Sequence, residues 1–172
     1  MADTWHAFTS GATFAANKYM IDVFNANTSA KTISVYRIWW FNNQTAAITG
    51  VINVMQIFRT STSSAGSSIT PAAHNTSNTA LDAGTTAGTG RTITTGSQFR
   101  QLLTSPDEAA VSTLDWDSMQ TFVPFAEVWN SGYGDTVIQP LTCRNGQDEG
   151  VTLKSVTQTV GNADFEMEFT SA

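Results

Sequence analysis

The stretch KTISVYRIWWFNNQTAAITGVINVMQIFRT, residues 31–60, decides the fold of this chain. It contains two runs of β-branched and aromatic residues, Ile33–Phe41 and Ile48–Phe58, on either side of the polar break Asn42–Thr45. Such residues favour the pleated surface of a β-sheet, and asparagine accommodates tight connections between strands. The pattern predicts a long β-hairpin whose two faces are both largely apolar and therefore covered. Because an isolated hairpin is only marginally stable in water, the remaining strands must supply a second sheet or a partner subunit.

Further strand-like segments, separated by turn signals, occur along the rest of the chain. The clearest is Ala163–Thr170, in which large apolar residues alternate with acidic ones, so it predicts one buried face and one wet, acidic face. Val137–Arg144 and Gly150–Thr159 flank an Asn145-Gly146 turn signal and predict a second hairpin. The whole pattern predicts an all-β fold: a single-domain antiparallel β-sandwich, a jelly roll of about eight strands. The other predicted strands are Asn17–Asn25, Arg91–Leu103 and Leu114–Trp129.

Two segments do not fit this pattern of regular strands. Residues 1–16 are small and polar with spaced aromatic residues, and we expect an N-terminal arm or, alternatively, a first strand; residues 17–172 then form the sandwich domain. Residues 60–90 are rich in Ser, Thr, Ala and Gly, and such a long structureless loop is uncommon inside a compact domain. We expect a long polar loop ordered by a partner, or an edge insertion with short strands around Ile69-Thr70 and Thr79–Leu81.

Composition and charge narrow the possible functions. Charged residues make up 13% of the chain, against about 25% in an ordinary soluble domain, which suits a surface covered by neighbouring subunits. The formal net charge is −6 and no run of Lys or Arg occurs, so we expect no binding to nucleic acid. No window approaches eighteen apolar residues, which predicts no membrane span. The N-terminal segment lacks the pattern of a secretory signal, so we expect synthesis in a cytosol without export.

The chemistry-bearing residues form no motif typical of an active site. His6 and His74 have no second ligand at metal-binding spacing, and no G-x-S-x-G occurs. The single cysteine, Cys143, excludes an internal disulfide and a cysteine-based zinc cluster, and we interpret it as a small buried apolar residue. The sequence therefore predicts no catalytic residues, no cofactor and no bound metal, and we expect that the protein is not an enzyme. Adjacent acids, interpreted as solvated or at most as loose calcium ligands, are Asp107-Glu108, Asp115 with Asp117, and Asp148-Glu149.

Three segments carry a resemblance to a known family: Val35–Arg59, Ser67–Thr76 and Gly132–Leu153. In these segments the chain resembles the capsid decoration, or cement, proteins of tailed bacteriophages that have a jelly-roll fold. The resemblance implies a structural virion protein that forms homo-oligomers, often trimers, on the major capsid protein. It further implies assembly in the host cytoplasm and a place on the outer surface of the capsid, and it carries over no catalytic residues.

The aromatic residues are the expected contact points. Trp39 and Trp40 are neighbours on one predicted strand, so they point to opposite faces and at most one can join the main core. If side chains alternate strictly along the strand, Trp40 lies on the same face as Ser34, Tyr36 and Ile38. An alternative is a carbohydrate- or receptor-binding sandwich of a virion fibre or tail, with Trp40 and Tyr133 at a sugar. The residues predicted to lie in a subunit interface are Trp5, Phe8, Phe14 and Trp40.

Overall fold

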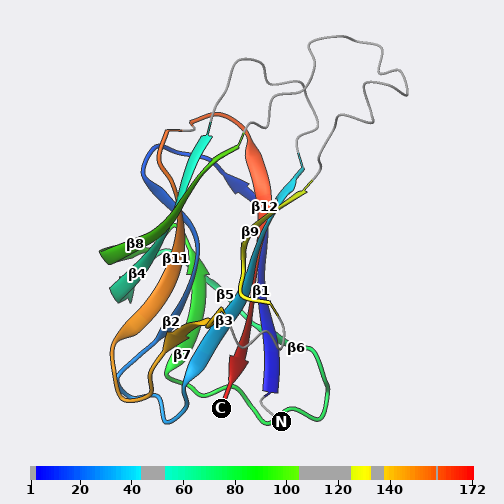
Figure 1. Cartoon of the computed structure of the whole chain (residues 1–172), viewed down its shortest axis with the longest axis vertical. Coiled ribbons are helices and arrows are strands. Elements are labelled where there is room, and N and C mark those ends of the chain that lie inside the picture. The colour runs from blue at the N-terminus through cyan, green and yellow to red at the C-terminus, as the bar shows by residue number, and fades with distance from the viewer. Residues whose placement is uncertain (1–2, 44–52, 105–124, 133–137, 158) are drawn as a thin grey trace.

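Two antiparallel sheets pack face to face in the computed structural model, which describes residues 3–43, 53–104, 125–132, 138–157 and 159–172 (Figure 1). Sheet A has the strand order β10-β3-β12-β1-β6, with β9 also paired to β3, and sheet B has the order β5-β7-β2-β11-β4-β8. The strands are β1 (Asp3–Thr13), β2 (Lys18–Asn25), β3 (Ile33–Asn42), β4 (Asn53–Ser64), β5 (Ser67–Ile69), β6 (Ala72–Ala73), β7 (Thr85–Thr89), β8 (Thr92–Thr104), β9 (Phe125–Asn130), β10 (Leu141–Cys143), β11 (Glu149–Ser155) and β12 (Asn162–Ser171).

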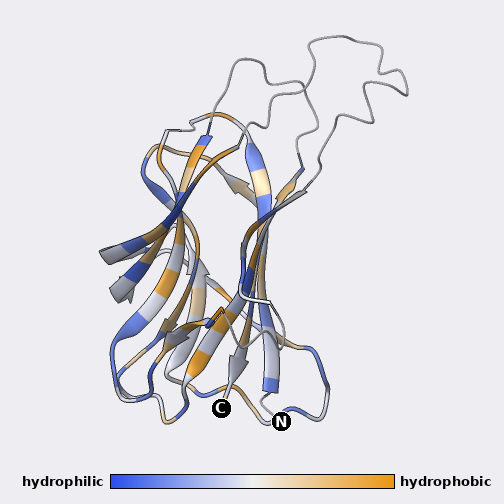
Figure 2. Cartoon of the chain, in the orientation of Figure 1, coloured by the Kyte–Doolittle hydropathy of each residue, from blue (hydrophilic) through white to orange (hydrophobic). Residues whose placement is uncertain are grey.

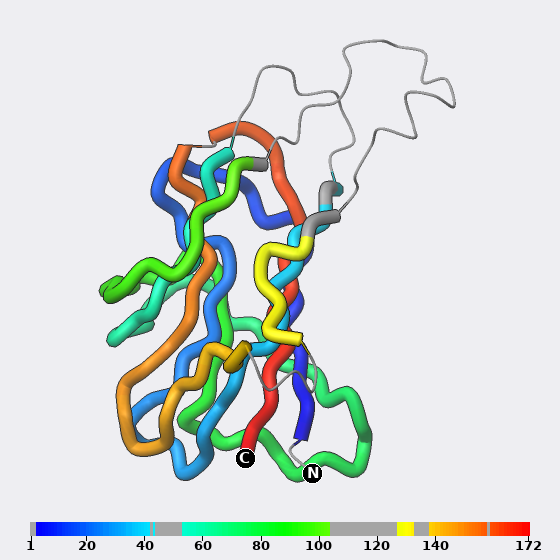
Figure 3. The backbone as a smooth tube through the Cα atoms, viewed as in Figure 1, coloured from blue at the N-terminus to red at the C-terminus, as the bar shows by residue number. Residues whose placement is uncertain are grey.

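The strand pairing is that of a jelly roll, as the sequence predicts. Four pairs are nested in the chain: β1 with β12, β2 with β11, β3 with β9, and β4 with β8. The first and third pairs lie in sheet A and the other two in sheet B, and β3–β12 and β4–β11 contacts join them side by side. A long hairpin of eight principal strands is thus rolled into two sheets. Figure 3 shows the result at the termini, where the blue N-terminal strand lies beside the red C-terminal strand.

The predicted central hairpin is wrong, because its two arms belong to opposite sheets. β3 pairs with β12, β9 and β10 in sheet A, whereas β4 pairs with β11 and β8 in sheet B. Both strands are interior strands of their sheets, so both are apolar, and that pattern fits two strands that face each other across a core as well as two that pair. The second predicted hairpin is wrong in the same way: β10 joins sheet A and β11 joins sheet B, with Gly146 in the turn between them at φ +66°.

A β-bulge reverses the expected faces of β3. Val35 pairs with Phe169 and Arg37 with Glu168, so Tyr36 is an extra residue in the ladder. Strict alternation holds on either side of the bulge but not across it. The residues that face the core are therefore Ile33, Val35, Ile38 and Trp40, all of them buried.

The segment expected as an N-terminal arm forms β1, the alternative that the sequence also allowed. β1 pairs with β12 along most of its length and with β6 on its other side. Trp5 and Ala7 face inward and are buried in the core, as is Phe14 just beyond the strand. An arm on a neighbouring subunit is therefore the wrong description of residues 3–13.

The polar segment 60–90 is an edge insertion. β4 continues through its first residues to Ser64, β5 and β7 then extend sheet B, and β6 extends sheet A. The amide of His74 and the Nδ2 of Asn78 both donate hydrogen bonds to the Thr4 carbonyl, at 2.9 Å each. The expected strand at Thr79–Leu81 is absent, and the second strand of sheet B in this insertion is β7 instead. The insertion thus covers β1 and β2 on one side of the sandwich.

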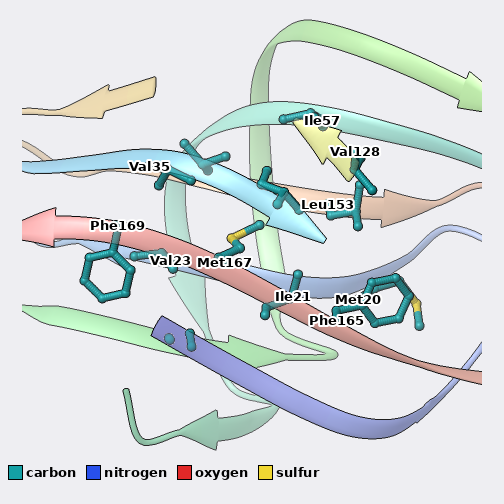
Figure 4. Close-up of a cluster of buried hydrophobic side chains, with 14 of the residues drawn as sticks. Met20, Ile21, Val23, Val35, Ile57, Val128, Leu153, Phe165, Met167 and Phe169 are labelled. Carbon is teal, nitrogen blue, oxygen red and sulfur yellow. The ribbon is translucent and has the colours of Figure 1, made fainter. Parts of the chain in front are cut away.

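One hydrophobic core fills the space between the sheets. β12 shows the predicted alternation, with Phe165, Met167 and Phe169 fully buried. Figure 4 shows these side chains together with Ile21 and Val23 of β2. Figure 2 shows apolar, orange segments on the strands of both sheets, which agrees with one shared core and a single-domain sandwich.

A buried ion pair between Arg91 and Asp22 lies next to the turn that joins β7 to β8 and the end of β4. The guanidinium of Arg91 lies 3.5 Å from the Asp22 carboxylate and donates hydrogen bonds to Ser63, Thr86 and the Ala87 carbonyl. Ser63 also donates to Asp22, at 2.8 Å. Burial raises the pKa of Asp22 to about 6, because the loss of hydration outweighs the opposing effects of the Arg91 charge and the Ser63 hydroxyl. The Arg91 charge and the Ser63 hydroxyl therefore offset only part of the cost of burying this carboxylate.

We expect Asp22 to make stability fall as the pH rises. The folded-state pKa of Asp22 is raised from 3.8 to about 6. Its contribution to the free energy of unfolding is therefore fully present below about pH 4 and is lost as the pH rises through about 6. The loss is at most about 3 kcal/mol. Urea unfolding of the wild type and of Asp22→Asn from about pH 3.5 to 7 measures it. The difference between the two curves should change across this window, and parallel curves would show that Asp22 is not the titrating group.

Candidate functional site

The outer face of sheet A gathers aromatic and acidic side chains from three adjacent strands. β12 has its apolar residues in the core, so its acidic residues lie on the opposite face. The bulge in β3 and the alternation of β1 add aromatic residues to the same surface. We call this surface the acidic–aromatic face; its members are Phe8 of β1, Trp39 and Phe41 of β3, and Asp164, Glu166 and Glu168 of β12.

Glu166 lies between two aromatic residues at the centre of this face. It is paired with Trp39 on one side and with Phe8 on the other. Phe8 is 44% exposed, whereas Glu166 is half-buried. Burial raises the pKa of the Glu166 carboxyl, the Glu168 charge adds to this, and two nearby histidines oppose it. A carboxylate that is partly dehydrated in this way gains more than a fully solvated one from a positively charged partner.

The next row across the sheet contains the charged and titratable neighbours. Glu168 pairs with Arg37 on β3 and with His6 on β1, and the Arg37 Nη1 lies 3.7 Å from the Glu168 Oε2. The ring of His6 contacts that of His74, with centroids 5.2 Å apart. The insertion therefore brings together the two histidines, which are 68 positions apart in the sequence (74 − 6 = 68).

A stacked aromatic pair occupies the β3 side of the face. The rings of Trp39 and Phe41 lie 6.2 Å apart at 23°, so they form a nearly parallel strip along the strand. Asp164 pairs with Phe41 and accepts hydrogen bonds from the Gly11 amide at 2.7 Å and the Asn43 Nδ2 at 2.5 Å. These two donors fix the carboxylate beside the rings.

Such a face can bind a partner without performing chemistry. Carboxylates accept strong hydrogen bonds from Lys and Arg, and aromatic rings offer apolar area and cation–π contacts. The side chains stand on interior strands of a sheet, so their spacing is fixed by the β-ladder. A protein surface with basic and apolar side chains fits this arrangement.

Three of the four predicted interface residues lie elsewhere. Trp5, Phe14 and Trp40 are buried in the core of the same chain and cannot contact another subunit. Phe8 is the only one on the surface, and it belongs to the acidic–aromatic face. The prediction chose the wrong member of the tryptophan pair, because the bulge at Tyr36 turns Trp40 inward and Trp39 outward.

The residues considered for metal binding have other roles where they are described. Within the described part of the chain, no group of three or more His, Cys, Asp and Glu side chains could hold a metal ion. Glu149 forms an ion pair with Arg144 at 2.5 Å, and Asp148 accepts a hydrogen bond from the Asn27 amide at 2.9 Å. Asp107, Glu108, Asp115 and Asp117 lie outside the described residues, as does Tyr133, which was predicted to lie at a sugar site.

We expect Cys143 to be chemically inert in the folded protein. Burial raises the pKa of its thiol to about 12, so the thiolate is scarce near neutral pH. A chromogenic disulfide reagent at about pH 8 should leave the native thiol unmodified and react fully once the protein is unfolded in guanidinium. Rapid reaction of the native protein would contradict the burial of this side chain.

Comparisons with known proteins leave the family open. The chain matches no protein-family model, and no similar curated protein or solved structure was found. Among the described residues there is no helix of the length and apolarity needed to cross a membrane. Function is therefore inferred from the fold and from the acidic–aromatic face.

Proposed function

We propose that the protein is a structural, non-enzymatic virion protein that decorates and stabilises a bacteriophage capsid. The observation that carries this proposal is the acidic–aromatic face, which presents rigidly spaced carboxylates and rings on the outer surface of sheet A. The resemblance of the sequence to capsid decoration proteins supports it. The net charge of −6 also suits the outside of a capsid better than its DNA-lined interior.

The major capsid protein is the proposed partner of this face. Glu166 and Glu168 bind its basic side chains, and Phe8 and Trp39 contact apolar or cationic groups beside them. Each contact is modest by itself. Many copies on one shell, together with contacts between copies of this chain, add up to a large gain in the stability of the shell. The protein assembles on the capsid in the cytoplasm of the host.

Rebinding to stripped capsids tests this proposal. Particles produced without this protein are mixed with the purified chain, and the bound fraction is measured by co-sedimentation. Glu166→Lys should weaken binding by about tenfold or more, because it reverses the charge at the centre of the face. Asp148→Lys makes the same change of charge at an exposed position off this face and serves as the control. Failure of the wild type to bind, or equal binding by the two variants, would overturn the proposal.

A second candidate function is carbohydrate binding, favoured by the Trp39–Phe41 strip. A sugar ring stacks its apolar face on aromatic rings and donates hydroxyl hydrogen bonds to a carboxylate such as Asp164. This version moves the sugar site from Trp40, which is buried, to Trp39. Binding to a glycan array that is lost on Trp39→Ala would support it, whereas binding to capsids but to no glycan would reject it.

A further inference from the structure

β8 is a long edge strand of sheet B in the described part of the chain. It has 13 residues, and among the described residues it pairs only with β4, so one side of its backbone has no strand partner. The other strands at sheet edges are shorter: β5, β6 and β10 have two or three residues each, and β9 has six. Proteins usually protect edge strands by keeping them short or by placing charges on them, since an open edge pairs readily with another strand.

β8 lacks the usual protection over a regular segment. Its only charged residue is Arg100. Irregularities in its register with β4 are confined to the part before Arg100, and residues 100–104 pair regularly with β4. Within this segment Leu103 is 67% exposed, the highest fraction of any large apolar side chain in the described residues. Residues 100–104 are therefore a regular, nearly uncharged strand edge with an exposed apolar side chain.

We propose that this edge pairs with the same edge of a second copy of the chain, antiparallel and around a two-fold axis at Leu102. In this register Gln101 of each copy faces Leu103 of the other on the outer side of the sheet. On the inner side the two Leu102 side chains meet. Leu102 is partly buried against the core, so the pairing extends the core of one copy toward that of the next.

The charges on the strand favour this partner and this register. The two Arg100 residues lie at opposite ends of the paired segment, so like charges do not face each other. A neutral strand facing its own copy has no electrostatic cost, whereas a strongly charged partner strand would find no complementary charges here. Sheet B then runs continuously through both copies.

The dimer leaves the capsid-binding face accessible. β8 lies at one side of the molecule and β1 and β12 at the other, in the opposite sheet (Figure 1). The inference therefore does not depend on the proposed function. It gives a two-fold dimer in place of the trimer that the resemblance implies.

The test is the native mass of the full chain, by light scattering and sedimentation velocity over a concentration series. The wild type should be a dimer. The double variant Q101K/L103K places positive charges opposite each other across the axis and should raise the dimer Kd by about tenfold or more. Q101K/L103E places opposite charges there and should keep the dimer. Both positions are exposed, so circular dichroism should show the same fold for both variants.

A third variant separates this edge from a general effect of added charge. Ile138→Lys introduces a lysine at an exposed apolar position outside β8 and should leave the dimer intact. A wild type that is monomeric at every concentration would overturn the inference, whether or not another protein's strand binds the edge. A dimer that is equally stable in Q101K/L103K and the wild type would overturn it as well.

Discussion

Replacing Arg91 with alanine is expected to lower the free energy of unfolding by about 3–5 kcal/mol near neutral pH. The substitution leaves the buried Asp22 carboxylate without its cation and removes hydrogen bonds to Ser63, Thr86 and the Ala87 carbonyl. Breaking a buried ion pair on one side costs far more than the pair contributes when both partners are present. Urea unfolding followed by tryptophan fluorescence measures the loss.

The partner of Arg91 supplies the control. Asp22→Asn in the Arg91→Ala background removes the isolated charge, so the double variant should be more stable than Arg91→Ala alone. Acid should have the same effect, since protonation of Asp22 removes its charge. If the two substitutions simply add, and if acid gives no recovery, then Asp22 and Arg91 are not coupled in the way their geometry indicates.

Replacing Phe165 with alanine is expected to cost about 3–5 kcal/mol as well, through loss of buried surface and creation of a cavity. Phe165 is fully buried in β12, and its ring meets the ring of Phe14 edge-on, with centroids 6.1 Å apart at 90°. Thermal and urea unfolding give the measurement.

The matched control for Phe165 is Phe8→Ala, which removes the same side chain from the surface of the adjacent β1. Because Phe8 is 44% exposed, its loss should cost about 1 kcal/mol or less. Similar losses at the two positions would mean that β12 does not direct Phe165 into the core, and the assignment of the acidic–aromatic face to its opposite side would then be wrong.

Local patterns in the sequence were sufficient to predict the fold class. The alternation of Phe165, Met167 and Phe169 with acidic residues predicts β12 and its buried face, and the structure confirms both. The strand predicted at Asn17–Asn25 is β2. The β12 prediction holds because a two-residue period is a property of one strand and needs no knowledge of its neighbours.

Pairing and register could not be predicted in the same way. Two apolar runs joined by a polar break are compatible with a hairpin and with strands in opposite sheets, and β3 and β4 take the second arrangement. The bulge at Tyr36 depends on the ladder that β3 forms with β12, whose partner residues lie more than a hundred positions away. No local signal in the sequence marks that extra residue.

The functional surface was predicted only in part. The acidic side of β12 follows from alternation, and Phe8 was chosen as a contact residue. Trp39 and Glu166 become neighbours only through the β3–β12 pairing, so their proximity could not be predicted from the sequence. The insertion that brings His74 to His6 was one of two alternatives for residues 60–90.

The copy number of this chain in purified virions tests the central claim most directly. Quantitative mass spectrometry of intact particles, with the major capsid protein as the internal reference, gives that number. A decoration protein bound through the acidic–aromatic face should be present in a fixed ratio to the major capsid protein, of the order of one copy per few capsid subunits. Particles that lack the chain, or that contain only a few copies of it, would contradict a role in stabilising the shell.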